Sequence, residues 1–375
     1  MSASRLTIGL VRRGHSETGG AEAYLKRLAR GLSDAGYGTR LFTDAAWPAR
    51  EWSWGPMTRL RGETAHRFAH ELEKIKPGAH CDLLLSLERI WRCDVYRAGD
   101  GIHQAWMQRR DAASSFFRRW LRRFNGKDRE ALELEQALFS GGAGRVIANS
   151  QMVKREAMQF YGYPAERIDV VPNGVPLADF RAHPAARGSR RKILRLRDDE
   201  IAVLFVGSGW ERKGLRHAIQ AVNSLGTNFR LFVAGHGRSR QLDGRAVQRL
   251  GAVRDLPALY AAADIFLLPT LYDPFSNACL EALAAGLPVI TTRDNGFSEI
   301  IEQRVHGSII DAPSNVGQIC NELLYWADAG HRKIARPAIL ERAGHFDISV
   351  NVERTLAALN HFPKAEAVSG KIRKT

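Results

Sequence analysis

Short apolar runs alternate with longer, helix-like segments along most of the 375 residues. In the first half the runs are RLTIGLV, TRLFT, DLLLSL and RVIANS, and in the second half they are IAVLFVG, RLFVAG, DIFLLP and LPVITT. Most of these runs are apolar without strict alternation of polar and apolar residues, which is typical of strands that are buried on both faces of a parallel sheet. The pattern therefore predicts an α/β fold in which helices cover parallel sheets.

The stretch from 171 to 200, VPNGVPLADFRAHPAARGSRRKILRLRDDE, interrupts this alternation and is rich in Pro, Gly and charged residues. A new strand pattern starts at Ile201, so we place a domain boundary within the stretch. The chain is also longer than a usual single domain. We predict two Rossmann-like, doubly wound domains, 1–175 and 176–345, followed by a segment 346–375 that ends in a basic tail. Ligands are expected at the carboxyl ends of the strands, where the domains face each other across a cleft.

Charge is the one unusual feature of the composition. The 55 Lys and Arg exceed the 40 Asp and Glu, giving a net charge of +15 that indicates an anionic partner: nucleic acid, anionic lipid or a phosphorylated small molecule. The four cysteines form no C-x-x-C pair, which favours a reduced, cytosolic protein without structural metal. No apolar run reaches the ~18 residues of a membrane span, so any membrane contact is expected to be peripheral.

The segment GSGWERKG, residues 207–214, follows the strand-like run IAVLFV. Gly207 allows a tight turn, and Arg212 and Lys213 place two cations after a strand, where they can neutralise a diphosphate. The segment matches neither the Walker A loop nor G-x-G-x-x-G. Taken alone, it also fits the basic start of a solvated helix.

The segment DPFSNACLEALAAGLPVITT, from Asp273, indicates a turn that enters a helix. Amide groups near Ser276, Asn277 and Ala278 are expected at the helix start, where they attract an anion. Glu281 can accept hydrogen bonds from a vicinal diol such as a ribose, and Asp273 can accept one from another hydroxyl. Each acid has a simpler explanation, since Glu281 would stabilise the helix dipole and Asp273 would suit a turn.

This segment resembles the nucleotide-binding signature of the retaining glycosyltransferases of family 4, which have the two-Rossmann-domain GT-B fold. GSGWERKG, ADIFLLPTLYDPF, VIANSQ and VVPNGV match further segments of that family, so the resemblance covers nearly the whole chain. DVYRAGDGIHQAW is similar to the branch that adds glucose to a heptose of the lipopolysaccharide core. The family signature has two Glu residues, whereas this chain has Asp273 in the first position, and this difference bears on the identity of the sugar.

The resemblance implies roles for the donor-domain residues. Arg212 and Lys213 would hold the donor diphosphate, and Glu281 would bind the ribose. Asp273 and the amides of 276–278 would contact the sugar and phosphate. The segment 346–375 would include a helix that returns to the N-terminal domain.

The resemblance also implies roles in the N-terminal domain. Gly19 and Gly20 would form a glycine loop that approaches the donor phosphate and the acceptor. Asp100 stands where many relatives carry a histidine thought to contact the donor sugar, and His103 lies one turn further on. An ordinary, partly buried histidine is an equal alternative for His103. The leaving phosphate can itself take the acceptor proton, so Asp100 is expected to position groups and not to act as a nucleophile.

Residues 115–129, SFFRRWLRRFNGKDR, place an aromatic stripe beside four arginines at helical spacing. This pattern is typical of a helix lying on an anionic membrane, although such a stripe also packs within a domain. The chain has no D-x-D triplet and no metal-ligand spacing, so we expect no metal and no cofactor apart from the nucleotide-sugar substrate.

Together these features predict a retaining hexosyltransferase that moves glucose from UDP-glucose to a lipid-linked saccharide of the lipopolysaccharide core. It would be cytoplasmic and peripheral on the inner membrane. Another nucleotide-sugar glycosyltransferase or a nucleotide-sugar epimerase of the same fold is the alternative. A nucleic-acid-binding protein would explain the charge but not Asp273, Glu281 or the glycine loops.

Overall fold

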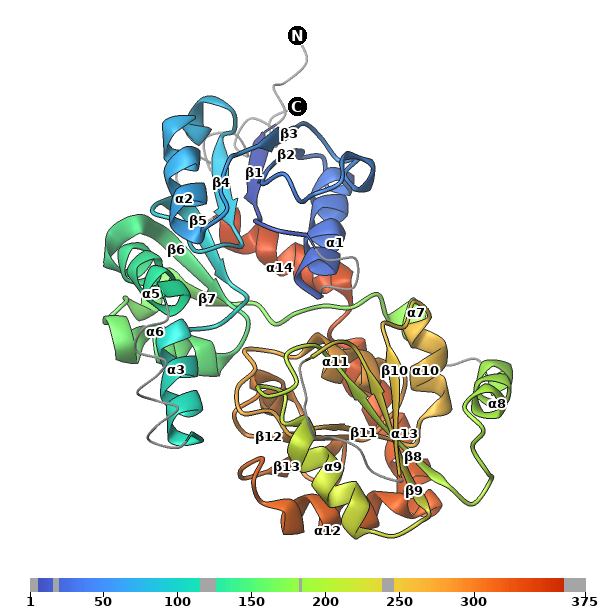
Figure 1. Ribbon diagram of the computed structural model, residues 1–375. Coiled ribbons are helices and arrows are strands. Elements are labelled where there is room, and N and C mark those ends of the chain that lie inside the picture. Colours follow the sequence, from blue (N-terminus) through green and yellow to red (C-terminus); the bar gives the residue numbers. More distant parts are fainter. Residues whose placement is uncertain (1–5, 16–19, 115–125, 182–183, 238–245, 361–375) are drawn as a thin grey trace. The chain divides into compact units, whose positions relative to one another are not determined.

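The computed structural model describes residues 6–15, 20–114, 126–181, 184–237 and 246–360 (Figure 1). The chain divides into two compact units, Met1–Pro172 with Ser349–Thr375, and Asn173–Ile348. The units divide after residue 172 and after residue 348, each three residues from a predicted boundary, after 175 and after 345. Most of the stretch 171–200 therefore belongs to the second unit, where it forms α7 (Leu177–Phe180) and α8 (Pro184–Ile193).

The described part of unit 1 contains a seven-stranded parallel sheet in the order β3-β2-β1-β4-β5-β6-β7. The strands are β1 (Thr7–Val11), β2 (Gly38–Thr43), β3 (Met57–Arg59), β4 (Leu83–Ser86), β5 (Cys93–Ala98), β6 (Ala143–Ala148) and β7 (Ile168–Val170). The helices are α1 (Gly20–Asp34), α2 (Ala65–Lys74), α3 (His103–Ala112), α5 (Gly126–Ala137), α6 (Gln151–Tyr161) and α14 (Ile348–Asn360).

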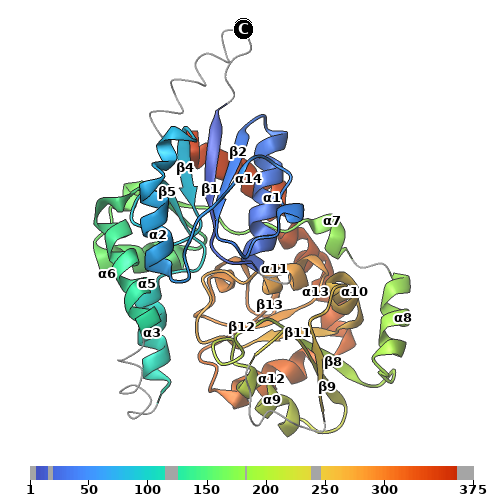
Figure 2. The same cartoon turned by 45° about the horizontal axis from the view of Figure 1, so that its top comes forward.

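Helix α14 returns to unit 1 and lies against α1 (Figures 1 and 2). The Tyr24 hydroxyl donates to Asn351 Oδ1 at 3.0 Å, and the Asn351 amide donates to the Pro172 carbonyl at 2.6 Å. Gly31 makes this packing possible, because a Cβ there would lie 2.5 Å from Val352. The return of the C-terminal helix thus rests on specific buried contacts within unit 1.

Unit 2 contains a six-stranded parallel sheet in the order β10-β9-β8-β11-β12-β13. The strands are β8 (Ile201–Val206), β9 (Phe229–Ala234), β10 (Val247–Gly251), β11 (Ile265–Leu268), β12 (Val289–Thr292) and β13 (Gly307–Ile310). The further helices are α9 (Leu215–Ser224), α10 (Leu256–Ala262), α11 (Asn277–Ala284), α12 (Val316–Ala327) and α13 (Ala329–Gly344).

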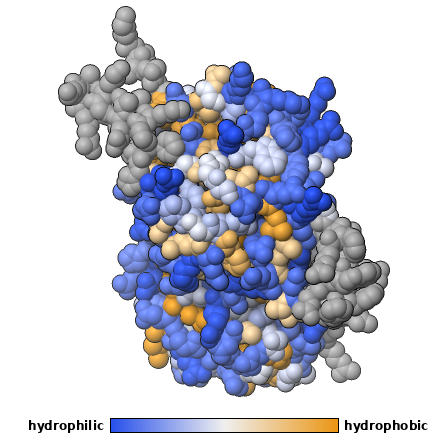
Figure 3. All heavy atoms as spheres, turned by 90° about the vertical axis from the view of Figure 1, so that its left-hand side faces the viewer, coloured by the Kyte–Doolittle hydropathy of each residue, from blue (hydrophilic) through white to orange (hydrophobic). Residues whose placement is uncertain are grey.

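All eight apolar runs form strands, which confirms the prediction of two Rossmann-like, doubly wound sheets. Strand β11, with the continuously apolar sequence IFLL, is buried along its whole length, and so is β12, which ends in two threonines. Elsewhere, hydrophilic residues cover most of the face shown in Figure 3, with smaller apolar areas among them.

Candidate functional site

The strand order of unit 2 reverses between β8 and β11, and the loops after these two strands lie side by side there. In open α/β sheets such a switch point is where ligands bind. Lys213 follows β8 and Asp273 follows β11, and the Lys213 ammonium forms a close ion pair with the Asp273 carboxylate. Only 11% of the Lys213 side chain and 7% of the Asp273 side chain are exposed. The sequence-predicted cation and acid therefore occupy one site.

Glycines shape the loop after β8. Gly214 has φ +74°, and a Cβ there would lie 1.8 Å from the carbonyl oxygen of Pro269, so the loop can approach β11 only with glycine at this position. Gly207 also adopts a positive φ, and its carbonyl accepts a hydrogen bond from the Trp210 indole at 3.1 Å. These contacts hold the loop after β8, which carries Lys213, close to the end of β11.

Arg212 is fixed by backbone contacts to the loop after β11. Its guanidinium donates to the Tyr272 carbonyl at 2.8 Å and lies 3.8 Å from Asp273 Oδ2. The Thr270 hydroxyl lies 2.9 Å from the Arg212 carbonyl oxygen, and the Leu271 amide donates to the same oxygen at 2.8 Å. The two cations thus stand beside one carboxylate, so these three side chains together carry one net positive charge.

Helix α11 begins within the same site, capped by Ser276, whose hydroxyl accepts a hydrogen bond from the Cys279 amide. Asn295 holds this turn, because its Oδ1 accepts from the Ser276 amide at 3.2 Å while its Nδ2 donates to Thr291 at 2.9 Å. The Ser276 amide is therefore engaged within the protein, which differs from its predicted role as a ligand donor. Asn277 and Ala278, the first two helical residues, are partly exposed.

The start of α11 also forms hydrogen bonds with Asn173, the first residue of unit 2. The Asn173 side-chain amide donates to the Phe275 carbonyl at 3.0 Å and to Asn277 Oδ1 at 2.8 Å. Asn173 is buried. The segment VVPNGV therefore helps to fix the orientation of the Asn277 side chain at the helix N-terminus.

Glu281 lies one turn into α11 and is partly exposed. The Tyr260 hydroxyl donates to Glu281 Oε2 at 3.0 Å and lies 3.1 Å from the Ala278 carbonyl. Burial first, and the Glu281 carboxylate next, raise the pKa of Tyr260 well above its ordinary value. Tyr260 therefore stays protonated and holds one oxygen of the Glu281 carboxylate in place.

In unit 1, Asp100 follows β5 and is half exposed, with 51% of its side chain accessible. Arg12, which follows β1, lies 3.5 Å from Asp100, 2.9 Å from Glu88 and 3.1 Å from Glu22. Asp100 thus belongs to an acidic group at the carboxyl edge of this sheet, held around one arginine. A role of Asp100 in positioning a substrate stays a prediction.

His103 begins α3, and its backbone amide donates to the buried Glu135 carboxylate at 2.7 Å. Its ring Nε2 lies 3.1 Å from Asp128 Oδ1. Burial first, and the Arg89 guanidinium next, lower the pKa of His103. These contacts give His103 a structural role at the start of α3, and contact with a substrate stays a prediction.

Two sequence predictions fall largely outside the described residues. Gly19 lies outside them, while Gly20 is the exposed first residue of α1. Of the proposed membrane helix 115–129, only 126–129 are described, as the start of α5. No helix among the described residues is long and apolar enough to cross a membrane. The same part of the chain has no group of three or more His, Cys, Asp and Glu side chains placed to hold a metal ion.

Four residues of the unit 2 site were not predicted from the sequence: Tyr260, Thr270, Asn295 and Asn173. Asn173 lies in VVPNGV and Asn295 follows a strand, so each had a local signal as a polar residue at a strand end or linker. Tyr260 had none, because its sequence suits the apolar face of an ordinary helix.

Family models match both units. A model described as Glycosyltransferase Family 4 matches residues 18–179, and one described as Glycosyl transferases group 1 matches residues 200–328. The chain belongs to the family 4 glycosyltransferases. This confirms the predicted family, and the two sheets are those of the GT-B fold.

Several known proteins have similar sequences. An uncharacterised glycosyltransferase of Methanocaldococcus jannaschii is 31% identical over 48% of this chain, and the match spans only half of that protein. A probable transglycosylase of Burkholderia thailandensis is 28% identical over 92% of this chain and 94% of its own length. The lipopolysaccharide glucosyltransferase WaaG of Escherichia coli is 29% identical over 60% of this chain and 64% of its own length.

Solved glycosyltransferases share the fold. WaaG, described as involved in lipopolysaccharide biosynthesis, matches with a TM-score of 0.79 at 21% identity, covering 94% of this chain and 98% of WaaG. HepE of Anabaena, solved with UDP and glucose, matches with a TM-score of 0.72 at 19% identity, covering 96% of this chain and all of HepE. At these identities the likeness shows the GT-B fold alone.

Proposed function

We propose that this family 4 member transfers a hexose from a nucleotide-sugar with retention of anomeric configuration, and that the donor is UDP-glucose. The observation that carries the proposal is the Lys213–Asp273 pair at the switch point of unit 2, beside Arg212 and the start of α11. A diphosphate entering here would compete with Asp273 for Lys213 and would be stabilised by two cations and a helix N-terminus. Glu281, oriented by Tyr260, would accept hydrogen bonds from the ribose.

The chemistry requires little from the protein beyond charge and position. The bond between the anomeric carbon and the donor phosphate oxygen breaks, and a bond to the acceptor oxygen forms on the same face of the sugar. The acceptor proton passes to the departing phosphate oxygen, so no protein base is needed. Lys213 and Arg212 would stabilise the negative charge that grows on the leaving diphosphate. We propose that these cations replace a metal ion.

The proposed acceptor is a lipid-linked saccharide of the lipopolysaccharide core, and the proposed location is the cytoplasmic face of the inner membrane. The sequence similarity to WaaG and the basic, aromatic residues 115–129 support this assignment. Replacing Arg122 and Arg123 with alanine should reduce binding to anionic vesicles and should leave binding of soluble donor unchanged. Equal vesicle binding by this variant would contradict the membrane role.

A transfer assay tests the function. The protein is incubated in EDTA with a heptose-containing core acceptor and, in turn, UDP-glucose, UDP-galactose, UDP-N-acetylglucosamine and GDP-mannose, and the product is examined by NMR. The expected product is an α-glucoside formed from UDP-glucose. A β-linked product would exclude retention of configuration. Transfer from another sugar nucleotide in place of UDP-glucose would exclude UDP-glucose as the donor. Conversion of a sugar nucleotide without any acceptor would indicate an epimerase.

A further inference from the structure

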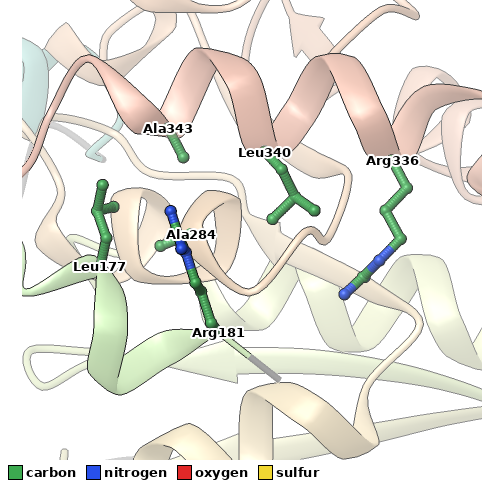
Figure 4. A pocket seen from close by; sticks show the side chains of 6 residues that line it. All are labelled: Leu177, Arg181, Ala284, Arg336, Leu340 and Ala343. Carbon is green, nitrogen blue, oxygen red and sulfur yellow. The ribbon is translucent and has the colours of Figure 1, made fainter. Parts of the chain in front are cut away.

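A pocket of about 380 Å³ lies in unit 2 between the end of α7, the end of α11 and helix α13 (Figure 4). It is lined by Leu177, Arg181, Ala284, Arg336, Leu340 and Ala343. None of these residues belongs to the site described above. The volume is at the lower end of the range for ligand pockets, ~300–1,000 Å³, so only a small guest fits.

The lining combines an apolar floor with two arginines. Figure 4 shows Arg181 extending from the segment after α7 towards Ala284 and Arg336 extending from α13, with Leu340 between them. Arg336 donates to the carbonyls of Ala285 and Gly286 at 3.2 and 3.1 Å, which fixes it at the end of α11. Among the described residues, no carboxylate lies within ion-pair distance of Arg181 or Arg336.

The neighbourhood of this pocket carries further positive charge. Arg187, Arg191 and Arg332 share a single buried carboxylate, Asp264, at 2.6, 3.0 and 3.7 Å. Partial burial first, and repulsion by Arg187 next, lower the pKa of Arg336. An anion in the pocket would relieve this repulsion between like charges.

We propose that the pocket binds a small anionic amphiphile, with a phosphate or carboxylate head group on a short alkyl chain. The head group lies against Arg181 and the outward N–H groups of Arg336, because a guanidinium presents paired donors that match both kinds of anion. The chain lies against Leu177 and Leu340. The site is independent of the nucleotide-sugar site, so it stands whether or not the proposed transferase activity is found.

Calorimetric titration of the full chain with octyl phosphate, below its micelle concentration and at constant ionic strength, tests the proposal. One saturable site is expected, with affinity about tenfold weaker for inorganic phosphate, which lacks the chain, and for neutral octyl glucoside, which lacks the charge. Equal affinity for octyl glucoside would overturn the role of the arginines. Equal affinity for inorganic phosphate would overturn the role of the apolar floor.

Variants locate the binding site. Arg181→Gln should weaken octyl phosphate binding about tenfold and should fold normally, because the Arg181 side chain makes no hydrogen bond to the described residues and its backbone amide, which donates to the Leu177 carbonyl, is kept. Lys333→Gln, which removes an exposed charge on the same helix α13 outside the lining, is the matched control and should bind as the parent does. Absence of binding by the parent, or equal weakening in both variants, would refute the proposal.

Discussion

Replacing Asp273 with asparagine should strongly destabilise unit 2, because it leaves the Lys213 ammonium without its counter-charge. Both side chains are almost fully buried, and removing one partner of a buried ion pair costs about 3–5 kcal/mol. The Arg212 guanidinium, 3.8 Å from Asp273, would then face Lys213 with no carboxylate between them. Lys213 keeps some access to water, so we expect a loss of about 3 kcal/mol, at the lower end of this range.

Differential scanning calorimetry is the suitable assay, since a chain of two units need not unfold in one step. A unit of this size loses about 2–4 °C in Tm per kcal/mol, so the transition of unit 2 should fall by about 6–12 °C in Asp273→Asn. Lys213→Met should lose less unfolding free energy than Asp273→Asn. The double variant should lose about 2 kcal/mol less than the sum of the two single losses. If the loss of unfolding free energy in the double variant equals the sum of the two single losses to within about 0.5 kcal/mol, the coupling between Lys213 and Asp273 is refuted.

Two further predictions concern the backbone and pH. Gly214→Ala should cost at least about 3 kcal/mol in unfolding free energy, because the added Cβ would clash with Pro269. Gly209→Ala is the control: Gly209 has a similar φ of +72° but nothing lies within 4 Å of the added Cβ, so the cost should be only about 1–2 kcal/mol. Equal losses of the two variants in chemical denaturation would contradict the clash. Because burial and Arg89 lower the pKa of His103, the native state binds a proton less readily than the unfolded state, so stability should fall as pH drops below about 6.5. His103→Gln should show a smaller loss in denaturation between pH 8 and 5, and an identical loss would show that His103 does not contribute.

The central strands could be predicted from the sequence, and the outer strands could not. Strands buried on both faces need continuous apolar runs, as in β8 and β11, and these runs are visible in the sequence. The edge strands β3, β7, β10 and β13 are short or carry polar residues, because one side of an edge strand has no neighbouring strand. Strand β5 was also missed, since its sequence CDVYRA is interrupted by charge.

The site was predictable where its residues form local motifs. Arg212, Lys213 and Glu281 stand in short segments that match motifs of the family, although the segment with Arg212 and Lys213, taken alone, also fits the basic start of a solvated helix. The pairing of Lys213 with Asp273 joins residues 60 positions apart, and the hydrogen bond from Tyr260 to Glu281 spans 21 positions. Such contacts depend on the strand order, which the sequence pattern does not specify.

Calorimetric titration of UDP-glucose in EDTA, with the parent chain and with Glu281→Ala, tests the central claim most directly. The parent should bind one UDP-glucose, and Glu281→Ala should bind at least about tenfold more weakly, because hydrogen bonds to a carboxylate contribute about 1.5–3 kcal/mol each. Glu341→Ala, which removes an exposed acid from α13, should bind as the parent does. Equal affinity of the parent and Glu281→Ala, or no binding by the parent, would contradict the assignment of this site to a nucleotide-sugar.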